Sequence, residues 1–478
     1  MNKTFKRILS STVCCLLALS SFAACGNPVN SGNGGNNGGY EAGGTIDPNI
    51  STTIKIGFYG KTDDDDKHFE LLEKAFQLRY PNVSVSLVSY SANNYYQDLM
   101  QAYQAGTMPD IIQTSATDAF PLIENNLLLN LDTYVKYEND KYAANKAEYP
   151  DLFPYESFED QFYDSMWKLG QENYNGSQYF VPRSSDRIVT YYNKKQFQEA
   201  GVDMSTVQNG WTWEQFLNAC IKLKDYYSTN LNGKPFISGQ WQWEAVLFPM
   251  LESVGAEVFD ANGNITVDSA ETRRAINLIK YLVDNGYTQE KNPSQQQFLT
   301  GQAAIQFHSL NADYYYNDLG EDLGIVTFPL IGREVNGVMD YSNAKIGAGI
   351  TGYGIFSELT GQKRDLAWEF LNLTLTKEGQ ECMADAGVSQ PPIRKDMEDG
   401  SNKWRQGKEN LNMEAFVWEP QRNHNTDFFL VHAASKQADL LETLIEMFNA
   451  PIRGNGSTVD AAIADCITML NQIISMVD

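Results

Sequence analysis

The chain has 478 residues, of which 42% are hydrophobic and 12% aromatic, a composition typical of a globular protein with enough length for two hydrophobic cores. Its 60 acidic residues outnumber 36 basic ones, and the formal net charge of −24 argues against nucleic acid or another polyanion as a partner. We interpret this acidity as a means of keeping the protein soluble, in preference to a specific cation-binding role.

The first 24 residues have the pattern of a secretory signal peptide. Lys3, Lys6 and Arg7 precede an apolar stretch, residues 8–24, that is too short to span a membrane comfortably. The small residues that follow Phe22 resemble the lipobox of bacterial lipoproteins and predict a mature chain beginning at a diacylglyceryl-modified Cys25. The alternative is an ordinary signal peptide that leaves Cys25 unmodified.

A run rich in Gly and Asn follows the proposed lipid site. Residues 25–50 lack the apolar side chains of a core, so we expect them to form a flexible tether. Three cysteines remain in the body of the chain, at Cys220, Cys382 and Cys466. An odd and widely scattered set argues against a disulfide framework or a zinc site, and we expect these thiols to be small core residues.

From residue 53 the chain alternates between strand and helix patterns. Strands are expected at 53–59, 83–88 and 111–112, with helices at 68–80 and 95–105. This alternation predicts a parallel sheet with crossover helices. Further strands are expected at 189–192, 327–330 and 354–356, and further helices at 212–227, 244–255, 269–285, 363–386 and 427–449. The sequence therefore predicts two α/β lobes joined more than once.

Several short segments carry a resemblance to a known family. They are YPNVSV (80–85), AGTMPDII (105–112), FVP (180–182) with YYNK (191–194), WTWEQF (211–216), FLTGQAAI (298–305) and DLAWEFL (365–371) with Glu378-Gly379. In this order, over about residues 54–395, they resemble the extracellular solute-binding protein family 1, which includes maltose- and maltodextrin-binding proteins. The chain is therefore expected to share that family's fold and function.

The resemblance implies an α/β fold of the type II periplasmic-binding-protein kind, a two-lobed clamp with a ligand cleft between lobes that are each a sheet flanked by helices. After a signal peptide (1–24) and a tether (25–50), lobe 1 would comprise residues 51–185 and 327–376, and lobe 2 residues 186–326 and 377–478. The chain would cross between lobes near 185–188, 325–328 and 376–379.

The same resemblance implies a monomeric lipoprotein outside the cytoplasm, held at the bacterial cell membrane only by the lipid on Cys25. It would capture a carbohydrate, an oligosaccharide in our interpretation, and deliver it to the permease subunits of an ABC importer. No cofactor, nucleic acid or catalytic step is expected. Two alternatives stay open, namely a secreted glycoside hydrolase with two catalytic carboxylates and a sugar sensor or adhesin on the same fold.

A sugar combines hydroxyl groups with flat apolar faces, so its sites pair aromatic rings with charged or amide groups. Carried over from the family, the ligand-binding residues are Tyr59, Lys61, Thr114, Ser115, Asp186, Trp241, Trp243, His308, Asn311 and Tyr353. The alternatives are helix packing for the two tryptophans, an ion pair with Arg183 or Arg187 for Asp186, and an ordinary loop histidine for His308. Trp211 and Trp213 are expected in the core.

Three other patterns are set aside. Residues 347–352 fit G-x-G-x-x-G but continue into a strand-like segment, whereas a dinucleotide site needs a helix there. The acidic segment 260–271 has calcium-loop spacing, yet Ile265 stands where such a loop requires Gly, so we expect a turn at Asn262-Gly263. The acidic run 63–66 is expected to be a solvated approach to a helix.

Overall fold

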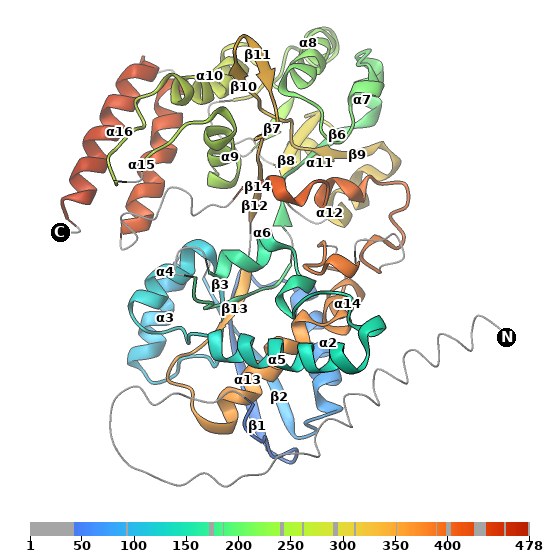
Figure 1. Cartoon of the computed structure of the whole chain (residues 1–478). Helices are drawn as coiled ribbons and strands as arrows, with labels where there is room; N and C mark the ends of the chain where they lie inside the picture. Colours follow the sequence, from blue (N-terminus) through green and yellow to red (C-terminus); the bar gives the residue numbers. More distant parts are fainter. Residues whose placement is uncertain are drawn as a thin grey trace, which may run out of the picture. The chain divides into compact units, whose positions relative to one another are not determined.

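The computed structural model describes residues 43–476 except residues 92–93, 172–175, 185, 240–242, 261, 290–294, 310–311, 350, 389, 398–402, 425–435 and 454–455. These residues belong to one compact unit, Ala42–Asp478 (Figure 1). The predicted signal peptide, the lipid site at Cys25 and the tether up to residue 42 lie outside the described residues.

The first sheet has five strands in the order β2-β1-β3-β13-β4. They are β1 (Thr52–Tyr59), β2 (Val83–Tyr90), β3 (Ile111–Ser115), β4 (Val181–Pro182) and β13 (Thr351–Ile355). Strand β1 pairs in parallel with β2 and β3, while β13 is antiparallel to β3 and β4. The three strands predicted at the start of the chain are confirmed. We call this sheet and the helices packed on it the first lobe.

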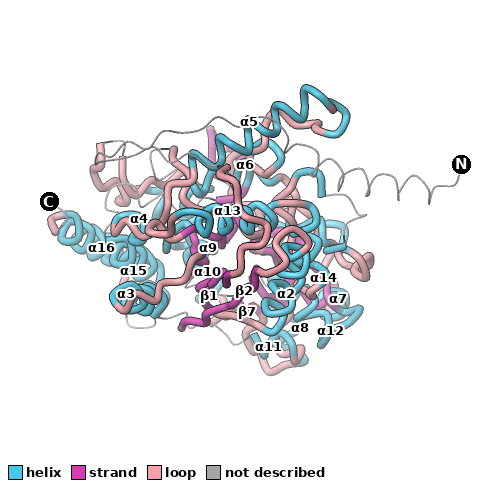
Figure 2. Tube along the Cα trace, turned by 90° about the horizontal axis from the view of Figure 1, so that it is seen from below, coloured by secondary structure: helices cyan, strands magenta, loops and turns pink. Residues whose placement is uncertain are grey.

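Helices α2 (Asp63–Gln77) and α3 (Tyr95–Gln104) lie on opposite sides of strands β1 and β2 (Figure 1, Figure 2). Helix α2 begins at a capping box, in which the Thr62 hydroxyl accepts from the Asp65 N–H and the Asp65 carboxylate accepts from the Thr62 N–H. The four aspartates are thus its first turn. The prediction of a solvated approach is wrong for Asp65, which is buried and forms an ion pair with Arg183.

The second sheet has four strands in the order β7-β8-β6-β9. They are β6 (Val189–Asn193), β7 (Ile237–Gly239), β8 (Ile305–His308) and β9 (Leu323–Thr327). Helices α8 (Trp213–Asn230), α9 (Glu244–Val254) and α10 (Ala270–Asp284) contribute to its core, which also contains Trp211. Trp211 and Trp213 are both buried, so their assignment to the core is confirmed. These elements form the second lobe.

The end of the chain adds to the second lobe. Short helical turns at Lys403–Arg405 and Met413–Phe416 place Trp404, Met413 and Phe416 in a core cluster with Tyr191 of β6. Helices α15 (Gln437–Asn449) and α16 (Val459–Ile474) then pack against each other, with α15 also on α9 and α16 also on α10.

A small three-stranded sheet lies where the chain passes between the lobes. It contains β5 (Asp186–Arg187), β12 (Ile346–Gly349) and β14 (Asn423–His424), in the order β14-β12-β5. The first crossing runs from β4 through β5 to β6, where the resemblance implied it. The second runs from β12 to β13, after the hairpin of β10 (Arg333–Val335) and β11 (Val338–Asp340).

One implied crossing and one expected helix differ from the structure. Phe328, Leu330, Ile331 and Ala344 pack in the core of the second lobe, so the second crossing falls near residue 350 and not at 325–328. The expected helix 363–386 is two helices, α13 (Gly361–Leu375) and α14 (Lys377–Asp385). They are separated by Thr376, whose extended backbone (φ −75°, ψ 163°) ends one helix and whose hydroxyl caps the next.

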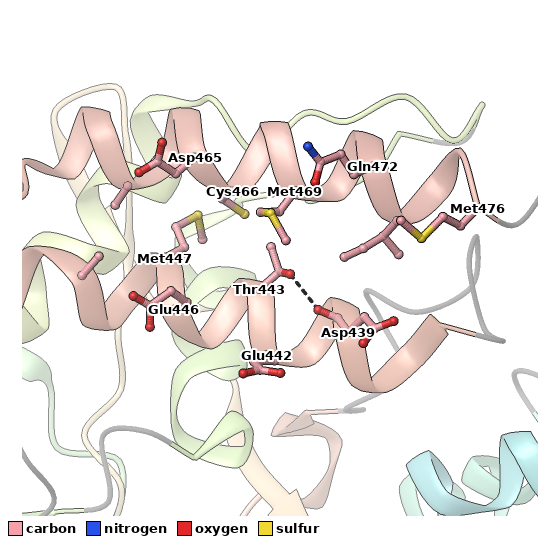
Figure 3. Close-up of a pocket in the computed structure, with 13 residues that line it drawn as sticks. Asp439, Glu442, Thr443, Glu446, Met447, Asp465, Cys466, Met469, Gln472 and Met476 are labelled. Carbon is pink, nitrogen blue, oxygen red and sulfur yellow. Dashed lines mark hydrogen bonds between the residues drawn. The ribbon is translucent and has the colours of Figure 1, made fainter.

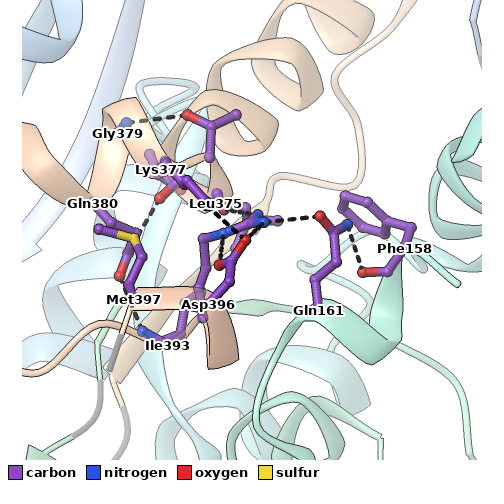
Figure 4. A network of polar contacts seen from close by, with 12 residues as sticks. Phe158, Gln161, Leu375, Lys377, Gly379, Gln380, Ile393, Asp396 and Met397 are labelled. Carbon is purple, nitrogen blue, oxygen red and sulfur yellow. Dashed lines mark hydrogen bonds and ion pairs between the residues drawn. The ribbon is translucent and has the colours of Figure 1, made fainter. Parts of the chain in front are cut away.

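Helix α14 packs on α2 and therefore belongs to the first lobe. Its Gln380 side chain donates to the carbonyls of Thr374 (2.9 Å) and Arg183 (3.1 Å) and accepts from the Ile393 N–H at 3.0 Å. In the same network, Arg394 donates to the Leu375 carbonyl and to Gln161 (Figure 4). These bonds hold α14, Ile393 and Arg394 on the first lobe, so the crossing implied at 376–379 is wrong and lobe 2 does not begin again at residue 377.

Two further expectations concern single residues. Cys220 and Cys466 are buried and Cys382 is half-buried, all as free thiols, which confirms the core assignment for the first two. The Asp260 carboxylate accepts from the Asn262 and Asn264 N–H groups at 2.8 Å each, and Gly263 has a φ of 81°, as the predicted turn requires. Among the described residues, no helix has the length and apolar character needed to span a bilayer.

Candidate functional site

The first part of the candidate site is formed where strands β1 and β3 end. Tyr59 is the last residue of β1; its N–H donates to the Gln113 side chain at 3.0 Å and its ring lies 4.7 Å from that of Tyr95. Ser115 ends β3 and caps α4 (Ala116–Glu124). Because parallel strands end at the same edge, Tyr59 and Ser115 belong to one edge of the sheet, the usual place for ligands in open α/β sheets.

Three predicted residues of the first lobe are committed to contacts within the protein. Lys61 forms an ion pair with Asp66. Thr114 is completely buried and donates to the Ser115 carbonyl at 3.2 Å. Tyr353 is 1% exposed and its ring stands edge-on to that of Phe69, at 5.9 Å between centroids. Thr114 and Tyr353 are therefore buried in this structure, and their contact with ligand stays a prediction.

The second lobe contributes an aromatic pair. His308 is the last residue of β8, and Trp243 precedes the first residue of α9; their rings lie 5.6 Å apart. Burial lowers the pKa of His308 to about 4, so its imidazole is neutral near pH 7 and able both to donate and to accept a hydrogen bond. Trp243 is half-buried, which leaves part of the indole accessible.

The remaining predicted residues give less information. Asp186 lies in β5, where its backbone pairs with Gly349 of β12. Trp241 and Asn311 lie outside the described residues. None of these three assignments is tested, and all stay predictions.

Sequence reasoning missed two carboxylates. Asp118, in the first turn of α4, accepts from the Ser115 hydroxyl at 2.8 Å. Burial raises its pKa, although the Ser115 hydrogen bond opposes the rise. Glu244 is the first residue of α9, beside Trp243. Burial also raises the pKa of Glu244, against hydrogen bonds from its own N–H and from Trp243, and the Asp118 charge raises it further.

The Asp118 charge is the smallest of the causes that shift the pKa of Glu244, so the two carboxylates interact weakly. Each follows a predicted residue closely, Asp118 three positions after Ser115 and Glu244 directly after Trp243. The sequence feature that could have identified both carboxylates is their position in the first turn of a helix, where the helix dipole stabilises acidic side chains. Two acceptors, two aromatic rings and a neutral imidazole suit a ligand with hydroxyl groups and apolar faces.

Two α/β lobes, joined by several crossings and carrying their polar groups at strand ends and helix N-termini, define a clamp-type ligand-binding protein. The sequence model of one family matches residues 67–381. The chain belongs to the bacterial extracellular solute-binding protein family.

Several proteins that the chain resembles are named for the sugars that they bind. The chain is 27% identical over 184 residues to an arabinooligosaccharide-binding protein of Halalkalibacterium halodurans, an alignment that covers 36% of this chain and 38% of that protein. An ABC substrate-binding protein of Listeria monocytogenes, solved with cycloalternan, superposes with a TM-score of 0.66 at 17% identity, over 89% of this chain and all of that one. The sugar-binding protein MalE of Xanthomonas citri gives a TM-score of 0.67 at 17% identity, over 89% and 98% of the two chains. The fold predicted from the sequence is thereby confirmed.

Proposed function

We propose that the protein is the substrate-binding subunit of an ABC importer and captures a carbohydrate, an oligosaccharide, between its two lobes. The observation that carries the proposal is the Trp243–His308 ring pair, with Glu244 directly after Trp243 and an electrostatic influence of Asp118 on Glu244. The indole offers a face for a sugar ring, and the carboxylates accept hydrogen bonds from its hydroxyls. The sugars bound by the relatives named above support the same ligand class.

The test is a thermal-shift screen of purified protein against monosaccharides, oligosaccharides, amino acids and short peptides. A ligand that binds only the folded protein, at a hundred times its Kd, adds about 2.7 kcal/mol to the free energy of unfolding. We expect oligosaccharides to raise the melting temperature. Glu244→Gln should reduce that shift and leave the unliganded melting temperature nearly unchanged. A shift with peptides and none with sugars would contradict the proposal.

One observation favours a second candidate, a glycoside hydrolase. Two carboxylates that interact electrostatically, both with a pKa raised by burial, also suit acid–base chemistry on a glycosidic bond. We nevertheless propose a binding role, because the relatives named above are binding proteins. Incubation with a sugar that the protein binds should return that sugar intact. Hydrolysis that is present in the parent and lost in both Asp118→Asn and Glu244→Gln would establish the hydrolase instead.

We also propose that the mature protein acts as a monomer outside the cytoplasm and is held at the membrane by a lipid on Cys25. The basic residues, apolar stretch and small residues before Cys25 support the lipid anchor, and the extracellular family supports the location. Cys25→Ser should yield a folded protein that stays in the aqueous phase of a detergent phase separation, because the two acyl chains are lost. Equal partitioning of parent and variant would contradict the lipid anchor.

A further inference from the structure

The last two helices form a groove that the proposed sugar site does not use. Helices α15 and α16 lie side by side in the red part of the chain (Figure 1). The groove between them has a volume of about 480 Å³ (Figure 3). It lies wholly beyond residue 381, where the family match ends. The family's sequence model therefore does not describe it.

The lining of this groove is rich in methionine. Met447, Met469 and Met476 line it together with Cys466 and Ile473. Met469 is 47% exposed and Met476 67% exposed. Burial raises the pKa of Cys466 to about 12, so this thiol acts as a small apolar group and not as a nucleophile. Methionine side chains are flexible and polarizable, and they adapt to apolar partners of varied shape.

The rim of the groove is acidic. Asp439, Glu442 and Glu446 come from α15 and Asp465 from α16. Glu446 is neutralised by Arg453, with two hydrogen bonds of 2.6 Å. Asp439, Glu442 and Asp465 have no ion pair with any residue that the structure describes. The dipole of α15 stabilises Asp439 in the first turn, but it does not explain the other two carboxylates.

We propose that this groove binds an amphipathic helix of another protein, with large apolar side chains on one face and Lys or Arg on both flanks. An apolar floor between acidic edges is complementary to such a helix in shape and in charge. A second copy of this chain would bring another net charge of −24, which opposes self-association. An anionic lipid surface would be repelled by the same rim.

The test uses two fluorescent 18-residue peptides and the full mature protein. One peptide has Leu at helical spacing with Lys at the flanking positions, and the other has Glu in place of Lys. Anisotropy titrations at low salt should show binding of the Lys peptide, at least tenfold weaker binding of the Glu peptide, and loss of affinity as salt is added. Equal binding of the two peptides would overturn the proposal.

Because the whole protein is acidic, a cationic peptide could be attracted to any part of it. A matched control distinguishes binding at the groove from this general attraction. The rim variant is Asp439→Asn/Glu442→Gln/Asp465→Asn. The control, Asp151→Asn/Glu257→Gln/Asp322→Asn, changes the net charge equally at exposed acids elsewhere. We expect at least a tenfold loss of affinity for the rim variant and less than twofold for the control. Equal losses would overturn the proposal.

The apolar floor is tested separately. Met469→Gln/Met476→Gln should lower the affinity for the Lys peptide at least tenfold. Met469→Leu/Met476→Leu should leave that affinity unchanged. Unchanged binding in the Gln variant would overturn the proposal. So would tighter binding to phosphatidylglycerol vesicles than to the peptide, or a dimer in the parent that the Gln variant abolishes. All variants should keep the parent's melting temperature, since both methionines are exposed.

Discussion

The buried ion pair between Asp65 and Arg183 makes a sharp prediction about the stability of the first lobe. Asp65 is 5% exposed and accepts from the Thr62 N–H at 2.9 Å and the Thr62 hydroxyl at 2.7 Å. Burial pushes the pKa of Asp65 up, but the Arg183 charge and the Thr62 hydrogen bonds outweigh it and hold that pKa below its ordinary value. The guanidinium of Arg183 also lies over the Phe58 ring, 5.3 Å from its centroid.

We expect Asp65→Asn to lower the free energy of unfolding by about 3–5 kcal/mol. Removal of one partner of a buried pair leaves the other charge buried and uncompensated, and that is the main cost. The amide oxygen of Asn can still accept from Thr62, so the helix cap should largely survive. Asp66→Asn is the matched control. It removes an ion pair with Lys61 at a 53% exposed side chain, so it should cost less than about 1 kcal/mol.

The assay is urea denaturation at pH 7, followed by circular dichroism and by tryptophan fluorescence so that separate unfolding of the lobes is recognised. Arg183→Met and the double variant complete a mutant cycle. The double variant should be more stable than Asp65→Asn alone, because it no longer buries a lone charge. Additive losses, or an Asp65→Asn loss no larger than that of Asp66→Asn, would refute the reasoning.

Three further predictions follow from single residues. Trp243→Ala should weaken sugar binding by about thirtyfold in calorimetry. Trp213 is buried, so Trp213→Ala should instead lower the free energy of unfolding by about 3–5 kcal/mol. A loss of stability without a loss of binding in Trp243→Ala would make Trp243 a packing residue. Burial is the main cause that lowers the pKa of His68 from 6.5 to about 3, and the Arg183 charge is the second. Between these pH values the unfolded chain therefore binds a proton at His68 that the folded protein does not. The parent should therefore lose up to about 1.4 kcal/mol per unit as pH falls from 6.5 to 3, and His68→Gln should flatten that slope in denaturation measured at several pH values. A Cβ on Gly347 would lie 1.6 Å from the Ala245 carbonyl oxygen, so Gly347→Ala should lower the melting temperature strongly, and an unchanged value would contradict the tight packing of β12 on α9.

The elements that sequence predicts well are those specified by local pattern. Strands β1 and β2 and helix α3 fall within a residue or two of their expected bounds, because each displays its periodicity within about ten residues. The break at Thr376 was missed, since apolar residues continue at helical spacing on both sides of it. The second crossing was placed too early because a core assignment such as that of Phe328 depends on residues far away in the sequence.

In the candidate site, too, the sequence predicts what depends on local pattern and misses what depends on residues far away in the chain. The sequence predicts that Tyr59 ends a strand and that Trp243 precedes a helix, because the resemblance identifies the loops that line the family's cleft. Burial of Thr114 and Tyr353 does not, since it depends on how β13 inserts beside β3. The glycines of residues 347–352 acquire a structural explanation as well. A Cβ on Gly352 would lie 2.3 Å from the Val181 carbonyl oxygen, so close packing of the crossing strands, and not phosphate binding, requires glycine there.

The first crossing is fixed at both ends by buried arginines. Arg183 is tied to Asp65 of the first lobe, and Arg187, which is fully buried, donates to the carbonyls of Trp418 and Glu419. Glu419 has the left-handed φ of 45°, uncommon for a residue with a side chain, which indicates that the surrounding contacts impose this conformation. Between these anchors, β5 pairs with β12 over only two residues. Any change in the angle between the lobes must therefore involve the few residues between Arg183 and Arg187, together with the other crossings of the chain. For the function we propose, anchors on both sides of a short pairing would allow the lobes to close on a ligand by a hinge motion that leaves both cores intact.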